Sequence, residues 1–92
     1  MGACVKHLII SGQVQGVGFR YYLLETTRRL GVRGWVRNRR DGTVEAMVEG
    51  APEAVAKIIE WAKSGPDGAR VTGVNVTEGE GRYTRFEQLP TL

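Results

Sequence analysis

Hydrophobic and polar residues follow two rhythms along the first third of the chain. The apolar run from Val5 to Ile10 is short, is bounded by Ser11-Gly12, and predicts a buried strand. Residues at helical spacing come next and predict a helix that ends at Gly31; they are Phe19, Tyr22, Leu23, Thr26, Thr27 and Leu30. The stretch between the two runs is therefore expected to be a turn.

The middle of the chain predicts a hairpin and a second helix. Residues 32–37 alternate between apolar and polar and indicate a half-buried strand. Residues 44–48 alternate in the same way beyond the tight-turn dipeptide Asp41-Gly42, which joins the two strands. Pro52 opens a helix whose apolar face is Val55, Ile58, Ile59 and Ala62.

The last third predicts one further strand and a candidate for another. Ser64 to Ala69 is a loop, Val71 to Thr77 is a fourth strand, and Tyr83 to Leu89 is a candidate for a short fifth strand at the edge. The order β-α-β-β-α-β predicts an α+β fold of the ferredoxin-like, split βαβ kind. We expect an antiparallel four-stranded sheet with two helices on one face. Because this fold has many functions, the chemistry must be inferred from a site.

Length and composition fit one small globular domain over residues 1–92, since 41% of the residues are hydrophobic and 25% are charged. No apolar run approaches the roughly 20 residues that span a bilayer, and the amino terminus lacks a signal-peptide pattern. The single cysteine, Cys4, cannot form an internal disulfide. We therefore expect a cytoplasmic protein without a membrane partner. The net charge of +3 indicates anionic partners only weakly.

The sequence GQVQGVGFR, residues 12–20, has three glycines and ends on an arginine. A turn between a strand and a helix needs one glycine or none. Backbone N–H groups in a glycine-rich turn can form an anion-binding nest, and the following helix adds its own free N–H groups and the positive end of its dipole. The planar guanidinium of Arg20 can bind two phosphate oxygens. The stretch therefore predicts a phosphate-binding site.

Two common phosphate loops do not fit, and neither does an RNA-binding module. The P-loop string is absent, and Tyr21 stands where the dinucleotide fingerprint needs its third glycine. Residues 15–22 are weakly similar to the core string of the RNA-recognition motif, but they fall in the turn before the first helix. The stacking aromatics of that motif lie in the middle of the sheet. Here the third strand has no aromatic residue and carries Glu45 and Glu49. Nucleic-acid binding is therefore disfavoured.

Residues 10–20, ISGQVQGVGFR, closely resemble the first motif of the acylphosphatases. Residues 34–38, GWVRN, resemble the second motif and are followed by Gly42, Val44 and Gly50 at the expected intervals. Two independent strings in the right order are far more specific than either one alone. The resemblance spans nearly the whole chain.

The resemblance implies an enzyme that hydrolyses the carboxyl-phosphate bond of an acyl phosphate to a carboxylate and inorganic phosphate. Arg20 would bind the phosphoryl group together with the backbone amides of Gln15, Gly16, Val17, Gly18, Phe19 and Arg20 itself, and Asn38 would orient the attacking water. The family uses neither a metal nor a phosphoenzyme. We accordingly expect a monomer that acts on a small-molecule acyl phosphate without a cofactor.

The residues are compatible with this chemistry and leave alternatives open. A carboxylate leaving group, whose conjugate acid has a pKa of roughly 4, hardly needs a general acid. His7, the only histidine, lies in the first strand, where a structural role is favoured. Asp41 belongs to a turn, and Asn38 alone is explained equally well as a residue approaching that turn. A phosphate- or carbamoyl-phosphate-binding module that acts with other chains also stays open.

Overall fold

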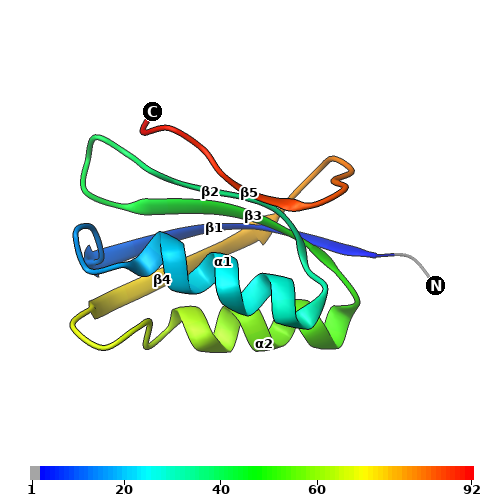
Figure 1. Ribbon diagram of the computed structural model, residues 1–92, viewed down its shortest axis with the longest axis horizontal. Helices are drawn as coiled ribbons and strands as arrows, with labels where there is room; N and C mark the ends of the chain where they lie inside the picture. The colour runs from blue at the N-terminus through cyan, green and yellow to red at the C-terminus, as the bar shows by residue number, and fades with distance from the viewer. Residues whose placement is uncertain (1–2) are drawn as a thin grey trace.

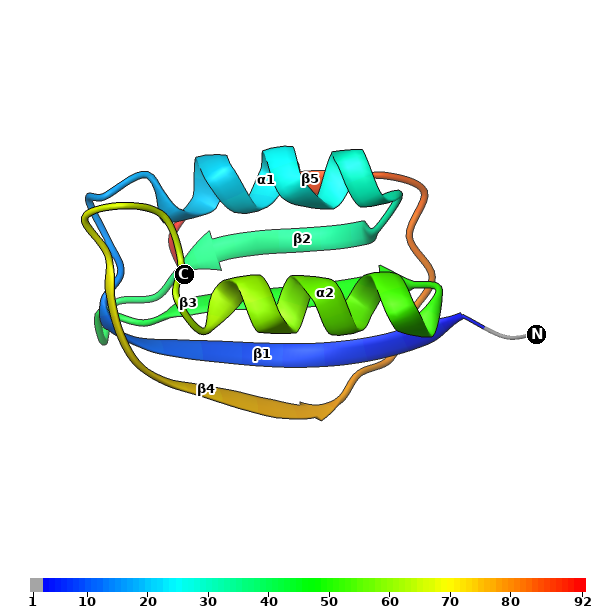
Figure 2. The same ribbon diagram turned by 90° about the horizontal axis from the view of Figure 1, so that it is seen from below.

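The computed structural model describes residues 3–92, which form two helices and five strands. In chain order these are β1 (Cys4–Gln13), α1 (Phe19–Leu30), β2 (Arg33–Asn38), β3 (Val44–Gly50), α2 (Pro52–Ala62), β4 (Arg70–Glu78) and β5 (Phe86–Gln88). Both helices lie side by side on one face of the sheet (Figure 1; Figure 2). The α+β, ferredoxin-like arrangement predicted from the element order is confirmed.

The sheet differs from the prediction in one respect. Its strand order is β4-β1-β3-β2-β5, so the fifth strand is present, and it pairs in parallel with β2 while the other pairs are antiparallel. The sheet is therefore mixed. The parallel direction of β5 follows from the path of residues 79–85. These residues cross one end of the sheet from its β4 edge to its β2 edge. Along that path the N–H of Gly79 donates to the carbonyl oxygen of Val5, and the N–H of Gly34 donates to that of Arg85.

The core lies between the sheet and the two helices. The sheet contributes mainly alternate residues of β1, β2 and β3, and the helices contribute the positions predicted from helical spacing. Fully buried members are Leu8, Ile10, Val36, Val44, Ala46, Val48, Phe19, Leu23, Val55, Ile58 and Ala62. Tyr22 is an exception to the predicted apolar face, since 49% of its surface is exposed. Helix α1 ends, as predicted, at Gly31 in the left-handed conformation.

Strand β1 is longer than the sequence predicted, because Gly12 bends the strand without ending it. The pairing register with β4 shifts between Ser11 and Gly12, which is a β-bulge. Gly12 has φ of 121°, and a Cβ atom there would lie 2.1 Å from the carbonyl oxygen of Arg70. The bulge carries the chain on to Gln13, directly before the glycine-rich turn.

Gly34 and Gly42 offer a matched test of how the sheet constrains glycine. Both have positive φ, but a Cβ at Gly34 would lie 1.8 Å from the carbonyl oxygen of Met47, whereas one at Gly42 would meet nothing within 4 Å. We expect Gly42→Ala to cost about 1 kcal/mol from backbone strain alone. Gly34→Ala should cost several kcal/mol or prevent folding, since strand β3 would have to move. Urea unfolding measures both, and equal losses would contradict this explanation.

Candidate active site

The glycine-rich turn is held in place at three points. Val14 and Phe19, at its two ends, are each only 1% exposed and anchor it in the core. Between them, Nε2 of Gln15 donates to the carbonyl oxygens of Arg39 at 2.7 Å and Thr43 at 2.9 Å. The side chain of Gln15 therefore fastens the turn to the β2–β3 hairpin, a role that the sequence did not indicate.

The backbone of the turn is curled so that its N–H groups stay free. Gly16 has φ of 76° and Gly18, the residue before α1, has φ of 81°. Outside the regular helices and strands of residues 3–92, no backbone–backbone hydrogen bond has its donor at residues 15–20. The first turn of α1 contains no acidic side chain. Free N–H groups at the positive end of a helix dipole form a site suited to an anion.

A cavity of about 120 Å³ lies between this turn, the start of α1 and the end of β2. Arg20, Asn38, Gly16 and Gly18 line it together, although Asn38 is distant from the other three in sequence. No carboxylate within residues 3–92 forms an ion pair with Arg20. Of the predicted residues, Phe19 also lines the cavity, whereas Gln15 and Val17 do not. The guanidinium of Arg20 is left available for an anion.

Asn38 is the last residue of β2, and the environment of its side-chain oxygen indicates a binding position. Oδ1 is buried and has no hydrogen-bond partner among the described residues. Leaving such an acceptor unpaired costs about 1–3 kcal/mol, so a buried unpaired oxygen at a cavity indicates a position for a donor such as water. The backbone of Asn38 is held firmly, because its carbonyl oxygen accepts the N–H of Leu92 at 3.1 Å.

Gln88 also lines this cavity and was not among the predicted site residues. It reaches the site because β5 pairs with β2, where Gln88 lies opposite Val36, two residues before Asn38. No local pattern in the sequence predicts that pairing.

Comparisons with known proteins identify the family of this chain. The Acylphosphatase family model matches residues 6–88. The chain is 58% identical over 89 residues to an acylphosphatase of Pyrobaculum islandicum, and the match covers 94% of each protein. The chain belongs to the acylphosphatase family. It is accordingly a hydrolase that acts on a small-molecule acyl phosphate.

Solved structures show the same relationship. The crystal structure of acylphosphatase from Bacillus subtilis is 37% identical, with a TM-score of 0.88 over 92% of this chain and 97% of that one. Full-length HypF, in a phosphate- and nucleotide-bound form, is 26% identical with a TM-score of 0.89. That match covers 97% of this chain but only 12% of HypF, so the same unit also occurs within a much larger protein.

The acylphosphatase structure shows neither a membrane-spanning helix nor a metal-binding cluster among its described residues. Within residues 3–92, neither helix has the length and apolar character needed to cross a membrane. The same residues contain no group of three or more His, Cys, Asp or Glu side chains arranged to hold a metal ion.

Asp41 lies in the turn between β2 and β3, as the sequence suggested. Its Oδ1 accepts hydrogen bonds from the backbone N–H and the hydroxyl of Thr43, at 3.0 and 2.6 Å. These bonds hold the pKa of Asp41 below its ordinary value. Asp41 does not line the cavity with Arg20 and Asn38, so its hydrogen bonds stabilise the turn and not the candidate site.

The open face of the sheet, opposite the helices, is occupied by ion pairs. Glu45 is buried between His7, whose Nε2 is 2.7 Å from Oε2, and Arg37, whose Nε donates to Oε1 at 2.9 Å. The guanidinium carbon of Arg37 in turn lies 4.8 Å from the centre of the Trp35 ring. His7 therefore has a structural role within the sheet, in agreement with the sequence interpretation.

The stabilisation that Glu45 gives this acylphosphatase is lost at acid pH. Burial would raise its pKa, but the hydrogen bonds from His7 and Arg37 outweigh burial and hold the pKa below its ordinary value of 4.5. A carboxylate whose pKa is lower in the folded than in the unfolded protein stabilises the fold at pH values above its unfolded-state pKa. That stabilisation is lost as the pH falls through its folded-state pKa. We expect Glu45→Gln to be less stable than the parent at pH 7, with the difference shrinking below about pH 4.

Urea unfolding at pH 7, 5 and 3.5 measures this difference. Glu87→Gln is the control, because the ion pair of Glu87 with Arg85 lies on the surface with both side chains substantially exposed, where such pairs contribute little. A Glu45→Gln deficit that stayed constant across this pH range would contradict the assigned charge state.

Proposed function

We propose that the cavity at the end of β2 is the catalytic site of this acylphosphatase. One observation carries the proposal. Within residues 3–92, the turn whose N–H groups have no backbone partner, the guanidinium of Arg20 without an ion pair, and the buried Oδ1 of Asn38 meet at one cavity. An anion-binding backbone beside a position for water is what hydrolysis of a phosphate ester or anhydride requires.

The phosphoryl group is bound by the turn and by Arg20. Its oxygens accept hydrogen bonds from the backbone amides of residues 15–20, and the guanidinium of Arg20 binds two of them side by side. These donors are already in position, so they stabilise the charge on the phosphoryl oxygens without reorganising during the reaction. Phosphoryl transfer needs little covalent help beyond this positioning.

Asn38 holds the attacking water. Its Oδ1 accepts one O–H of the water, which leaves a lone pair of the water oxygen free to attack phosphorus. A bond forms between that oxygen and phosphorus while the bond from phosphorus to the acyl oxygen breaks, and the carboxylate leaves with the electron pair. A phosphate oxygen of the substrate takes the proton of the water. The leaving carboxylate, with a conjugate-acid pKa of roughly 4, needs no general acid.

We also propose that residues 1–92 act as one domain, in the cytoplasm, as a monomer without a nucleic-acid partner. All the groups named above come from one chain, and the ion pairs of Glu45 replace the aromatic platform that an RNA-binding sheet would present. The similarity to HypF supports one rival, an acyl- or carbamoyl-phosphate-binding module that acts with a partner. Hydrolysis of benzoyl phosphate by the purified chain alone separates the two.

Arg20→Lys tests the phosphoryl-binding role. Lysine keeps the charge but lacks the planar pair of donors, so kcat/KM for benzoyl phosphate should fall by at least about a hundredfold. Tens of millimolar inorganic phosphate, an order-of-magnitude choice for a weak site, should raise the Tm of the parent and no longer that of the variant. Arg28→Lys, an exposed arginine at the other end of α1, is the matched control. Near-native turnover by Arg20→Lys would show that the guanidinium is not required.

Asn38→Ala separates water positioning from phosphate binding. The variant should lower kcat at least about a hundredfold while leaving the increase in Tm caused by phosphate almost unchanged, because phosphate does not depend on the side chain that holds water. Asn75→Ala, which changes an exposed asparagine of the edge strand β4, provides the comparison. Loss of phosphate protection with kcat retained would reverse the two roles.

The proposed mechanism uses no metal ion. We therefore expect steady-state hydrolysis of benzoyl phosphate to proceed at an undiminished rate in excess chelator. Activity that chelator abolishes and that added magnesium or zinc restores would contradict this mechanism.

A further inference from the structure

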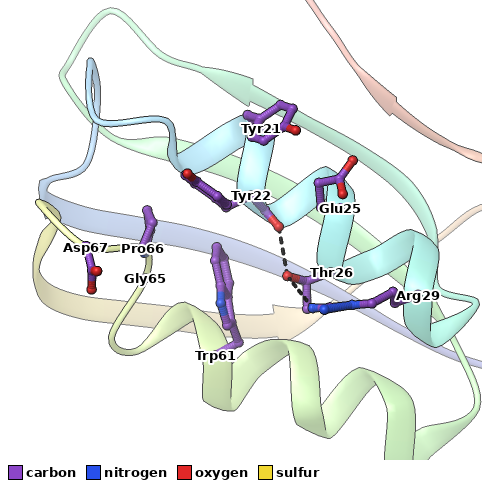
Figure 3. A pocket seen from close by; sticks show the side chains of 9 residues that line it. All are labelled: Tyr21, Tyr22, Glu25, Thr26, Arg29, Trp61, Gly65, Pro66 and Asp67. Carbon is purple, nitrogen blue, oxygen red and sulfur yellow. Dashed lines mark hydrogen bonds between the residues drawn. The ribbon is translucent and has the colours of Figure 1, made fainter.

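A second and larger cavity, of about 500 Å³, lies in a groove between α1 and the loop that follows α2. We call it the aromatic groove. Tyr21 and Tyr22 of α1 and Trp61 of α2 line it, with Thr26, Arg29 and the loop at residues 65–67. Figure 3 shows Tyr22, Trp61 and Pro66 gathered around its opening, with the carboxylate of Glu25 directed away from α2. Its volume is in the range of small-molecule sites.

The walls of the aromatic groove are packed in place. The ring of Trp61 meets that of Phe19 edge to face at 5.2 Å, and a Cβ at Gly65 would lie only 2.7 Å from the Phe19 ring, so the loop rests directly on Phe19. Tyr21 and Tyr22 pack edge to face at 5.1 Å, yet they stay 56% and 49% exposed. Two exposed aromatic rings beside a cavity are suited to contact a ligand.

The aromatic groove adjoins the proposed catalytic site. Tyr21 lines both cavities. The ring of Tyr22 lies 3.3 Å from the position of a Cβ on Gly18, so it covers the end of the phosphate-binding turn. Phe19, which lines the catalytic cavity, also supports the groove from below through Trp61 and Gly65.

The in-line geometry of phosphoryl transfer places the acyl group on the side of this groove. Attacking and leaving oxygens lie roughly in line on opposite sides of phosphorus. The proposed water position at Asn38 lies on the β2 side of the turn, whereas the aromatic groove lies on the α2 side of α1. The leaving carboxylate therefore departs on the side of Tyr22 and Trp61.

We infer that the aromatic groove binds the acyl group of the substrate and that Tyr22 determines specificity for acyl groups that carry a flat ring. The inference rests on the proposed function, because it takes the phosphoryl group to be bound by residues 15–20. A ring contacts Tyr22 and the edge of Trp61, whereas an acetyl group is too short to reach beyond the turn. The substrate class indicated is an aromatic acyl phosphate.

The test compares two substrates that differ only in the acyl group. For each variant, the ratio of kcat/KM for benzoyl phosphate to that for acetyl phosphate is measured, which cancels any loss of folded protein. We expect Tyr22→Ala to lower this ratio about tenfold through KM for benzoyl phosphate, and Tyr22→Phe to keep it near the parent value because the ring remains. Tyr83→Ala removes a tyrosine outside the groove and should leave the ratio unchanged.

The outcomes separate this inference from the proposed function. If Tyr22→Ala keeps the parent ratio while Arg20→Lys still loses turnover of both substrates, the groove assignment is wrong and the catalytic assignment stands. A ratio lowered equally in Tyr22→Phe and Tyr22→Ala would assign the effect to the hydroxyl and overturn the role of the ring. A parent chain that hydrolyses neither substrate would overturn both.

Discussion

The site depends on a left-handed backbone conformation that the turn could not keep without support. At Gly16 nothing within 4 Å would obstruct a side chain, so the glycine is needed for its φ of 76° alone. The conformation is held from outside, by the buried anchors Val14 and Phe19 and by the two hydrogen bonds of Gln15. Without these supports, a glycine-rich turn would sample many conformations and lose the convergence of its N–H groups.

The C-terminal segment of the chain provides a second support for the candidate site, at Asn38. After β4, residues 79–85 cross the end of the sheet, and β5 then runs beside β2. The N–H groups of Leu89 and Leu92 donate to the carbonyl oxygens of Val36 and Asn38. Asn38 thus stands on a strand that is paired on both sides, which gives its amide a fixed position in front of the turn. A residue at a free strand edge would be positioned less precisely for the proposed role of holding water.

The sequence predicts features that repeat locally, and it misses those that depend on distant pairing. Helical spacing and Gly31 predicted α1, and the glycine-rich turn indicated Arg20. The role of Asn38 was indicated only by the resemblance to the acylphosphatases. The parallel pairing of β5, and with it the place of Gln88, requires a path across the sheet that no periodicity encodes. The hydrogen bonds of Gln15 join residues 24 and 28 positions apart, so its side chain gives no local signal either. The sequence predicts a strand end at Gly12, where the structure has a β-bulge, because glycine is common both at bulges and at strand ends.

Phe19 contacts both the proposed phosphate-binding turn and the wall of the aromatic groove. It is the first residue of α1, so its backbone belongs to the phosphate-binding turn, while its ring carries Trp61 and the loop at Gly65. A shift of this ring would move the anion-binding N–H groups and the wall of the aromatic groove together. Close packing transmits such a shift because the core has little free space to absorb it. The buried position of Phe19 therefore fixes the proposed phosphoryl site and the proposed acyl site relative to each other.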